Sequence, residues 1–356
     1  MIGQVNVEPH TSKETTTGGS PKIDLALYDL STHPAVRAWS TLHGEAARPR
    51  GIQILKFPRG EFDKSCTFRV TGIGPERTSV IAKLSRAPIA QLECLIYRDI
   101  LPRLPVPRLE FYGTVPSEVQ GLDWVFIEDA GEEKYTRDDP NDRRLATEWI
   151  AALHTSAASL PEFENLPDRG PAHYLEHLRS ARRRIAASHF NPALTRDQRA
   201  VLDRADYYLQ SYEASWNELE RLCRFMPRTL AHGDLARRNT RLRVNADVRG
   251  LVVFDWEMAG RGVPAPDLAS SLIRKFPSCL GTYFSSVRQT WPALNFEDIT
   301  RMAVVGRIMR VIAAIDWASV SLQFEEPLFL AKPVSYIQSY IRRIETEIGE
   351  PPWTKT

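Results

Sequence analysis

Short apolar segments separated by polar links follow the first 50 residues of the chain. Segments 51–57, 66–72 and 78–84 are rich in β-branched and aromatic side chains, whereas the links between them are polar or contain glycine. This alternation is typical of strands joined by tight connections. We therefore predict a three-stranded antiparallel meander, to which segments 108–115 and 123–129 add two further strands.

Helical periodicity dominates the rest of the chain. Apolar residues recur at the helical period between about 24 and 47, and again over 90–101, where a cluster of prolines follows. From about 141 to about 348 the pattern is helical, apart from a short strand pair around a polar loop at 225–260. These patterns predict an α+β fold with a small antiparallel-sheet lobe before a larger, mainly helical lobe.

The composition is that of an ordinary globular protein. Hydrophobic residues make up 43% of the 356 positions and charged residues 25%, and the formal net charge is +2. This balance indicates no nucleic-acid partner, and no apolar run reaches the roughly 18 residues of a membrane span. The N-terminus lacks the hydrophobic stretch of a secretory signal, and the four cysteines have no paired spacing. We therefore expect reduced thiols and a cytoplasmic location.

The most informative region spans residues 230–269, where three side chains suit phosphoryl transfer. Asp234 lies in a polar loop after an apolar strand, a usual place for a side chain that accepts the proton of an attacking hydroxyl. Asn239 follows five positions later, close enough in a tight loop for its carbonyl oxygen to face the same metal site. Asp255 ends a buried apolar run, where a carboxylate is costly unless a cation neutralises it.

A family motif runs through this region. It consists of HGDL at 232–235, Asn239, and DWE at 255–257 after a hydrophobic run. It resembles the signature of the aminoglycoside phosphotransferase and choline kinase-like superfamily, whose members are relatives of the protein kinases. The resemblance implies a protein kinase-like two-lobe fold, with Asp234 as catalytic base and Asn239 and Asp255 as Mg²⁺ ligands.

The same resemblance calls for a phosphate-holding pair in the N-terminal lobe. Lys83 lies on the third predicted strand and Glu93 on the helix that follows, where related enzymes hold the α- and β-phosphates of ATP. The loop that would cover the phosphates contains only one glycine, Gly60, and has Ser65 just before the second strand. Backbone amides at 60–65 would cradle phosphate, and the alternative is an ordinary hairpin turn.

Residues 123–133 are expected to join the lobes and to bind the nucleotide base. The resemblance assigns this contact to the backbone carbonyl of Glu128 and the backbone amide of Ala130, so ATP and GTP are not distinguished. The predicted organisation is a flexible tail at 1–22, a nucleotide-binding lobe at 23–130, and a helical lobe at 131–356 with the catalytic loop and acceptor site.

Four polar residues near the motif allow more than one interpretation. Asp267 either braces the catalytic loop through backbone amides, as the resemblance implies, or caps the helix that follows. Glu257 either contacts a metal through water or faces solvent. His232 is expected to brace the loop rather than transfer protons, and His154 either lines the catalytic core or packs as a satisfied buried side chain.

The acceptor site is expected among the C-terminal helices. Asp316, Trp317, Glu325 and Glu326 would form an acidic, aromatic wall for a cationic acceptor, although a core tryptophan and a polar helix end are the favoured interpretation. The basic run 179–189 would meet an acidic acceptor, but it is favoured as the solvated face of a helix.

The predicted function is ATP- and Mg²⁺-dependent phosphorylation of a small-molecule hydroxyl. Gly233 stands where protein kinases have an arginine, which favours a small acceptor, and we predict a monomer or homodimer without nucleic-acid or membrane partners. Aminoglycosides, macrolides, amino alcohols and sugars are all acceptors on related scaffolds, so the acceptor stays open. The alternative is a non-catalytic, nucleotide-binding pseudokinase, which loss of the four key residues would favour; all are present, namely Lys83, Asp234, Asn239 and Asp255.

Overall fold

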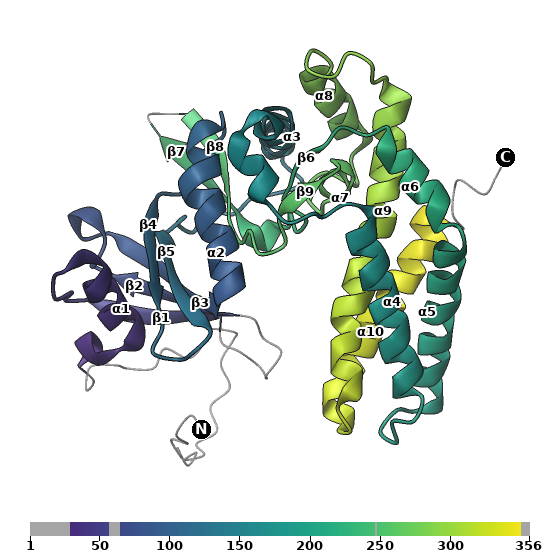
Figure 1. Cartoon of the computed structure of the whole chain (residues 1–356), viewed down its shortest axis with the longest axis horizontal. Helices are drawn as coiled ribbons and strands as arrows, with labels where there is room; N and C mark the ends of the chain where they lie inside the picture. The colour runs from purple at the N-terminus through teal and green to yellow at the C-terminus, as the bar shows by residue number, and fades with distance from the viewer. Residues whose placement is uncertain (1–28, 57–64, 246–247, 350–356) are drawn as a thin grey trace.

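A small sheet lobe lies beside a larger, mainly helical lobe in this protein (Figure 1). The computed structural model describes residues 29–56, 65–245 and 248–349. The predicted tail at 1–22 and the loop that contains Gly60 lie outside these residues. The arrangement confirms the predicted α+β, protein kinase-like class.

A five-stranded antiparallel sheet organises the smaller lobe. Its strand order is β1-β2-β3-β5-β4, and the first three strands form the predicted meander. Helix α2 runs on into a π-helical turn at Ile96–Ile100. The elements of this lobe are α1 (Pro34–His43), β1 (Gly51–Lys56), β2 (Ser65–Thr71), β3 (Ser79–Arg86), α2 (Ala87–Leu95), β4 (Phe111–Pro116) and β5 (Leu122–Glu128).

The two faces of the sheet pack against different partners because side chains alternate along a strand. Trp124 and Phe126 of β5 pack with α1 in a small core of their own. Val125, which lies between them, belongs to the large core shared with the helical lobe. Lys83 is paired with Val125 in the β3–β5 ladder, so its side chain points to this second face. The alternation thus directs Lys83 toward the helical lobe.

Helix α1 is shorter than the predicted segment 24–47. It begins at Pro34, whose fixed φ suits a first helical position, and the His33 side chain accepts a hydrogen bond from the Ala35 amide. It ends before Gly44, which adopts a left-handed φ of 71°. The periodic pattern therefore overestimated the helix at its C-terminal end.

The larger lobe combines helices with two short strand pairs, where the sequence predicted only one. Strands β6 (Thr229–Ala231) and β9 (Gly260–Gly262) pair with each other, as do β7 (Thr240–Asn245) and β8 (Val248–Val253). The helical run at 199–223 is broken at Ser215. The helices are α3 (Pro140–Ser156), α4 (Pro171–Ser188), α5 (Arg196–Ala214), α6 (Trp216–Arg224), α7 (Ala265–Leu268), α8 (Pro277–Val287), α9 (Phe296–Ser319) and α10 (Pro327–Arg343).

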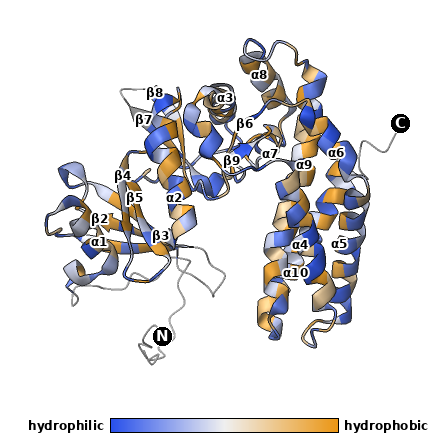
Figure 2. Cartoon of the chain, viewed as in Figure 1, coloured by the Kyte–Doolittle hydropathy of each residue, from blue (hydrophilic) through white to orange (hydrophobic). Residues whose placement is uncertain are grey.

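Hydrophobic residues concentrate on the central strands and on α2, whereas hydrophilic residues make up much of α5 (Figure 2). Among the described residues, no helix is both long and apolar enough to cross a membrane. The four cysteines, all of them described, form no disulfide. The catalytic-loop motif lies between β6 and β7, and Asp255 follows β8, so both face the groove between the lobes.

Candidate active site

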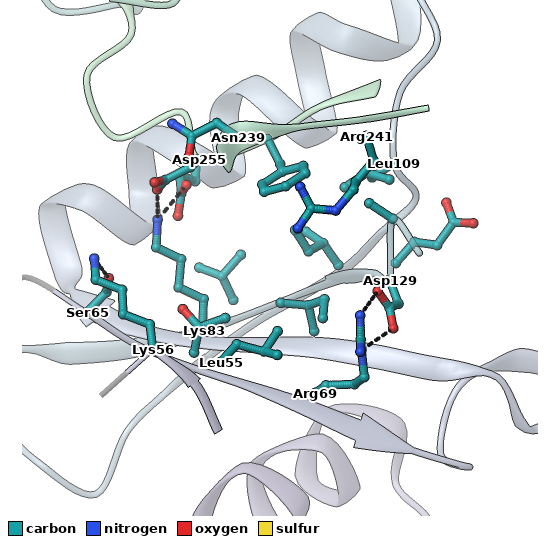
Figure 3. Close-up of a pocket in the computed structure, with 18 of the residues that line it drawn as sticks. Leu55, Lys56, Ser65, Arg69, Lys83, Leu109, Asp129, Asn239, Arg241 and Asp255 are labelled. Atoms are coloured by element: carbon teal, nitrogen blue, oxygen red, sulfur yellow. Dashed lines mark hydrogen bonds and ion pairs between the residues drawn. The ribbon is translucent and has the colours of Figure 1, made fainter. Parts of the chain in front are cut away.

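A buried lysine joins two carboxylates from different parts of the chain. Lys83 Nζ donates to Glu93 Oε1 at 2.9 Å and to Asp255 Oδ1 at 2.6 Å (Figure 3). Lys83 comes from β3, Glu93 from α2 and Asp255 from the segment after β8. The predicted strand–helix contact between Lys83 and Glu93 is therefore present, and it reaches the second motif as well.

The three charged groups of this cluster shift one another's pKa values. Burial lowers the pKa of Lys83, but Glu93 and Asp255 together raise it above its ordinary value, so the ammonium group stays charged. Burial raises the pKa of Glu93 despite Lys83. For Asp255, burial raises the pKa, but Lys83 outweighs it, and the net pKa is lowered. Asp255 is thus held as a carboxylate.

The backbone fixes Asp255 in an unusual conformation. Its φ is 67°, in the left-handed region that residues other than glycine seldom adopt. The next amide, that of Trp256, donates to Glu93 Oε1 at 3.1 Å. Glu93 therefore binds both Lys83 and the backbone of the DWE motif. The Asp255 carboxylate, in this strained conformation, lies toward the lysine.

Asp234 has three side-chain partners. Arg310 Nη2 donates to its Oδ1 at 3.0 Å, and Arg238 forms an ion pair with its Oδ2. Asn239 Nδ2 donates to the backbone oxygen of Asp234 at 3.0 Å and to Oδ2 at 3.2 Å. The five-residue spacing thus brings the Asn239 amide back to Asp234, while the metal-facing role of its carbonyl oxygen stays a prediction.

Asp267 braces the catalytic loop. Its carboxylate accepts hydrogen bonds from the amides of His232 at 2.7 Å and Gly233 at 3.0 Å, and it lies 3.3 Å from His154 Nε2. Burial raises the pKa of Asp267, but the hydrogen bonds from His154 and the His232 amide bring it below its ordinary value. The capping interpretation is wrong, because α7 already begins at Ala265.

The two histidines of this region are structural. His232 Nε2 lies 3.2 Å from the Phe254 carbonyl and its Nδ1 lies 3.3 Å from the Asp234 amide, so it braces the loop as predicted. His154 is fully buried, and its Nδ1 lies 2.8 Å from the Tyr283 hydroxyl. His154 therefore packs as a satisfied buried side chain.

Gly233 is required by the shape of the loop. Its φ is 74°, and a Cβ atom added to it would lie 2.7 Å from the Met258 carbonyl oxygen. The position where protein kinases have an arginine therefore has no room for a side chain here, which gives a physical reason for the glycine seen in the sequence.

A cavity of about 450 Å³ opens beside Lys83, between the sheet and the catalytic loop (Figure 3). It has the size of a small-ligand pocket. Its apolar side is formed by residues such as Ile81, Val125 and Phe254, and its polar side contains Lys83 and Asp255. Every nucleotide and metal residue predicted from the sequence lines it: Ser65, Lys83, Glu93, Glu128, Ala130, Asn239 and Asp255.

The donor groups at the polar side of this cavity suit a magnesium ion. Asn239 uses its amide nitrogen on Asp234, which leaves its carbonyl oxygen for another partner, and Asp255 uses Oδ1 on Lys83. Mg²⁺ commonly binds through one or two protein oxygens and completes its shell with water and substrate phosphates. Within the described part of the chain no cluster of three or more His, Cys, Asp or Glu could hold a metal, so an all-protein metal site is not present there.

Residues 67–296 match the model of the phosphotransferase enzyme family called APH. The chain belongs to this family. No match was found among curated proteins. The family model spans both Lys83 and the HGDL and DWE motifs, so most of the residues around the cavity lie within the matched range; Leu55, Lys56 and Ser65 precede it.

Solved structures of related phosphotransferases share this fold. A spectinomycin phosphotransferase in complex with ADP and spectinomycin is 11% identical, with a TM-score of 0.54 over 84% of this chain and 94% of that one. The GDP complex of a mutant aminoglycoside 2′-phosphotransferase is 14% identical, with a TM-score of 0.57 over 87% and 97%. A choline kinase from Cryptosporidium parvum is 12% identical, with a TM-score of 0.52 over 85% and 92%.

Some residues of this phosphotransferase lie elsewhere than the sequence suggested. Glu257 is half-buried, and its Oε2 is buried without a hydrogen-bond partner among the described residues. Asp316 is 6% exposed and pairs with His177 at 2.7 Å and with Arg184, so its charge is already neutralised. Trp317 packs against the core, as the favoured interpretation had it.

The basic run at 179–189 is largely paired with acidic residues of neighbouring helices. Arg179 and Arg182 both bind Glu213 of α5, and Arg183 binds Glu176 within α4. This confirms the solvated-face interpretation and removes the run as an acceptor site.

Sequence reasoning missed the two arginines on Asp234. Arg238 lies between Asp234 and Asn239 of the motif, and no role was assigned to it from the sequence. Arg310 is an arginine in the middle of an apolar helix, between Met309 and Val311, which are both fully buried. A charged residue in such a stretch is a signal that a buried partner exists.

Proposed function

We propose that this protein is an ATP- and Mg²⁺-dependent kinase that phosphorylates a hydroxyl group of a small molecule. The observation that carries the proposal is the meeting of two polar clusters at one cavity: Lys83 binds Glu93 and Asp255, and Asn239, which lines the same cavity, binds Asp234. Phosphoryl transfer needs both a cation that holds the phosphates and a carboxylate that accepts the hydroxyl proton.

Asp234 is the proposed base. It takes the proton of the acceptor hydroxyl, whose oxygen forms a bond to the γ-phosphorus of ATP. The bond from this phosphorus to the bridging oxygen breaks, and ADP leaves. Lys83, oriented by Glu93, holds the α- and β-phosphates, and its charge favours the negative oxygens there. Asp267 acts through the loop, because it accepts hydrogen bonds from the amides of His232 and Gly233, the two residues that precede Asp234.

Asn239 and Asp255 are the proposed Mg²⁺ ligands. When bound, the ion would neutralise charge on the phosphate oxygens. The carbonyl oxygen of Asn239 and the Asp255 carboxylate line one cavity, and Asp255 is held ionised by Lys83. The presence of both oxygen donors at one cavity supports their assignment as Mg²⁺ ligands.

The proposed nucleotide base lies at the other end of the cavity. The Glu128 side chain is turned aside, because it binds Arg243 at 2.9 Å and accepts from the Glu110 amide at 3.0 Å. This supports base contacts by the main chain, through the Glu128 carbonyl and the Ala130 amide. Two structural neighbours were solved with ADP and GDP respectively, so both ATP and GTP are donors to compare.

Transfer of label from γ-labelled ATP to an acceptor panel tests the proposal directly. Aminoglycosides, amino alcohols, sugars, hydroxy acids and macrolides should be compared with and without Mg²⁺. Nucleotide binding without any transfer would favour the pseudokinase alternative, and transfer unaffected by chelation of Mg²⁺ would contradict the metal assignment.

Asp255→Asn is expected to raise the Mg²⁺ concentration needed for half-maximal activity by about 10–100-fold, the range typical when a metal site loses one supporting group. The side chain keeps its shape and loses its charge. A Mg²⁺ titration of initial rates measures the shift. Asp129→Asn, at the opposite end of the cavity, is the matched control. An unchanged Mg²⁺ requirement would exclude Asp255 as a ligand.

Lys83→Met is expected to lower kcat/KM for ATP by roughly 10–150-fold, the equivalent of one hydrogen bond to a charged group. The variant also leaves Glu93 and Asp255 without their shared cation. The double variant Lys83→Met/Glu93→Gln removes one of these charges and should recover folding without recovering activity. Recovery of ATP use in the double variant would show that Lys83 serves only the fold.

A further inference from the structure

Both carboxylate oxygens of Asp234 are held by arginines, although a base must offer one of them to the acceptor. Arg310 binds Oδ1 at 3.0 Å and Arg238 binds Oδ2. The Arg310 side chain comes from the middle of α9 and is 17% exposed, whereas that of Arg238 is 66% exposed and also lines the nucleotide cavity. An acceptor that approaches Asp234 therefore meets two guanidinium groups.

More positive charge lies next to these arginines. Burial raises the pKa of the Tyr340 hydroxyl on α10, and the positive charges of Arg343, Arg310 and Arg238 act to lower it. Arg343 Nε is buried without a hydrogen-bond partner among the described residues. The carboxylate that it pairs with, Glu347, is 3.9 Å away and is bound at 2.8 Å by another arginine. The wall beside the base is thus rich in cations.

The acids that would serve a cationic acceptor are neutralised or distant. Asp316 already pairs with His177 and Arg184. Glu326 immediately precedes the first turn of α10, 14 residues before Tyr340, and its side chain makes no capping hydrogen bond. At the helical rise, that separation is about 21 Å along the axis. The acidic wall considered from the sequence is therefore not assembled around Asp234.

We propose that the acceptor carries an oxyanionic group, a carboxylate or a phosphate, and that Arg310 and Arg238 bind this group when the acceptor hydroxyl reaches Asp234. This rests on the function proposed above and narrows its acceptor class. A guanidinium matches a planar or tetrahedral oxyanion through paired N–H donors. Exchange of an arginine from Asp234 to the acceptor keeps that arginine paired and releases a carboxylate oxygen for the hydroxyl proton.

A purely structural role for Arg310 gives a different expectation. Arg310 also donates to the Gly233 carbonyl, so it braces the catalytic loop. Loss of a brace would slow transfer to every acceptor alike. Loss of an anion-binding group would raise KM for anionic acceptors only, and would also weaken the binding of a simple oxyanion that cannot react.

The first experiment measures the binding of inorganic sulfate by calorimetry at constant ionic strength, with the nucleotide cavity filled by Mg²⁺ and a non-hydrolysable ATP analogue. Sulfate is expected to bind about 10–100-fold more weakly to Arg310→Gln than to wild type. Arg301→Gln, a substitution of an exposed arginine on the same helix, is the matched control and should bind like wild type. Arg238→Gln serves as a second variant, because its mostly exposed side chain should not be needed for folding.

The second experiment measures transfer from γ-labelled ATP to pairs of compounds that differ in charge. Glycerate is compared with glycerol, gluconate with glucose, and choline and kanamycin represent cations. The anionic member of each pair is expected to be preferred, and Arg310→Gln should lower that preference, the ratio of kcat/KM for the anionic member to kcat/KM for the neutral member, by about 10–100-fold.

Equal sulfate affinity in wild type, Arg310→Gln and Arg238→Gln, or an adventitious site that persists in all three, would overturn the proposal whether or not any acceptor reacts. Preferred transfer to a cation or a neutral compound, unaffected by Arg310→Gln, would overturn it while the kinase function stands. Sulfate binding that depends on both arginines, without phosphoryl transfer to any compound, would support the anion site and count against the kinase function.

Discussion

Asp234→Asn is expected to lower kcat by about 10²–10⁴-fold, the range that general acid–base catalysis contributes. The amide has the shape of the carboxylate and still offers an oxygen to Arg310, but it cannot accept the acceptor proton. Nucleotide binding should change little, because Lys83, Glu93 and Asp255 keep their own contacts. Single-turnover transfer of label from γ-labelled ATP measures the chemical step directly.

Asp203→Asn is a matched control for this variant, because Asp203 is an exposed aspartate of α5 that pairs with His189 at the surface. It should behave as wild type. Transfer at the wild-type rate by Asp234→Asn would show that another group accepts the proton. His232 would be tested next, although burial lowers its pKa.

The family resemblance and local sequence patterns were enough to predict that Lys83 would pair with Glu93 and that Asn239 would lie near Asp234, whereas the roles of these residues stay predictions. Lys83 and Glu93 are ten positions apart on consecutive elements, and strand alternation together with helix spacing decides that both side chains meet. Asp234 and Asn239 belong to one loop, so their contact depends on few torsion angles. Predictions of this kind survive because they need no knowledge of how distant helices pack.

The contacts of Asp234 with Arg310 and of Asp267 with the HGDL loop depend on how distant helices pack. Arg310 lies 76 positions after Asp234 and reaches it because α9 crosses α7 closely. A Cβ atom at Gly306, one turn before Arg310, would clash with the Ala265 carbonyl, so only glycine permits this approach. Local preference allowed Asp267 to cap a helix, whereas the resemblance implied that it braces the HGDL loop, and the amides of this distant loop are its partners. The backbone amides supplied by the tertiary fold outweighed the local preference of an aspartate for a helix cap.

Asp267→Asn is expected to destabilise the helical lobe by about 3–5 kcal/mol, the cost of removing one charged partner from a buried polar cluster. An asparagine has one carbonyl oxygen for two amides, and its NH₂ group would oppose the other amide or His154. The midpoint of urea unfolding measures the loss, with Asp203→Asn again as the surface control. An unchanged midpoint would mean that the loop holds its shape without this carboxylate.

The same variant has a characteristic pH dependence. The folded-state pKa of Asp267 lies below its ordinary value, so its charge contributes stability in full above the unfolded pKa of about 3.9. That contribution is lost as the pH falls through the lower folded-state value. The stability difference between wild type and Asp267→Asn should therefore be constant near neutrality and shrink only in strong acid. A difference that instead disappeared between pH 5 and 7 would point to titration of another group, such as His232, and would make that group, rather than the carboxylate, the one that holds the catalytic loop.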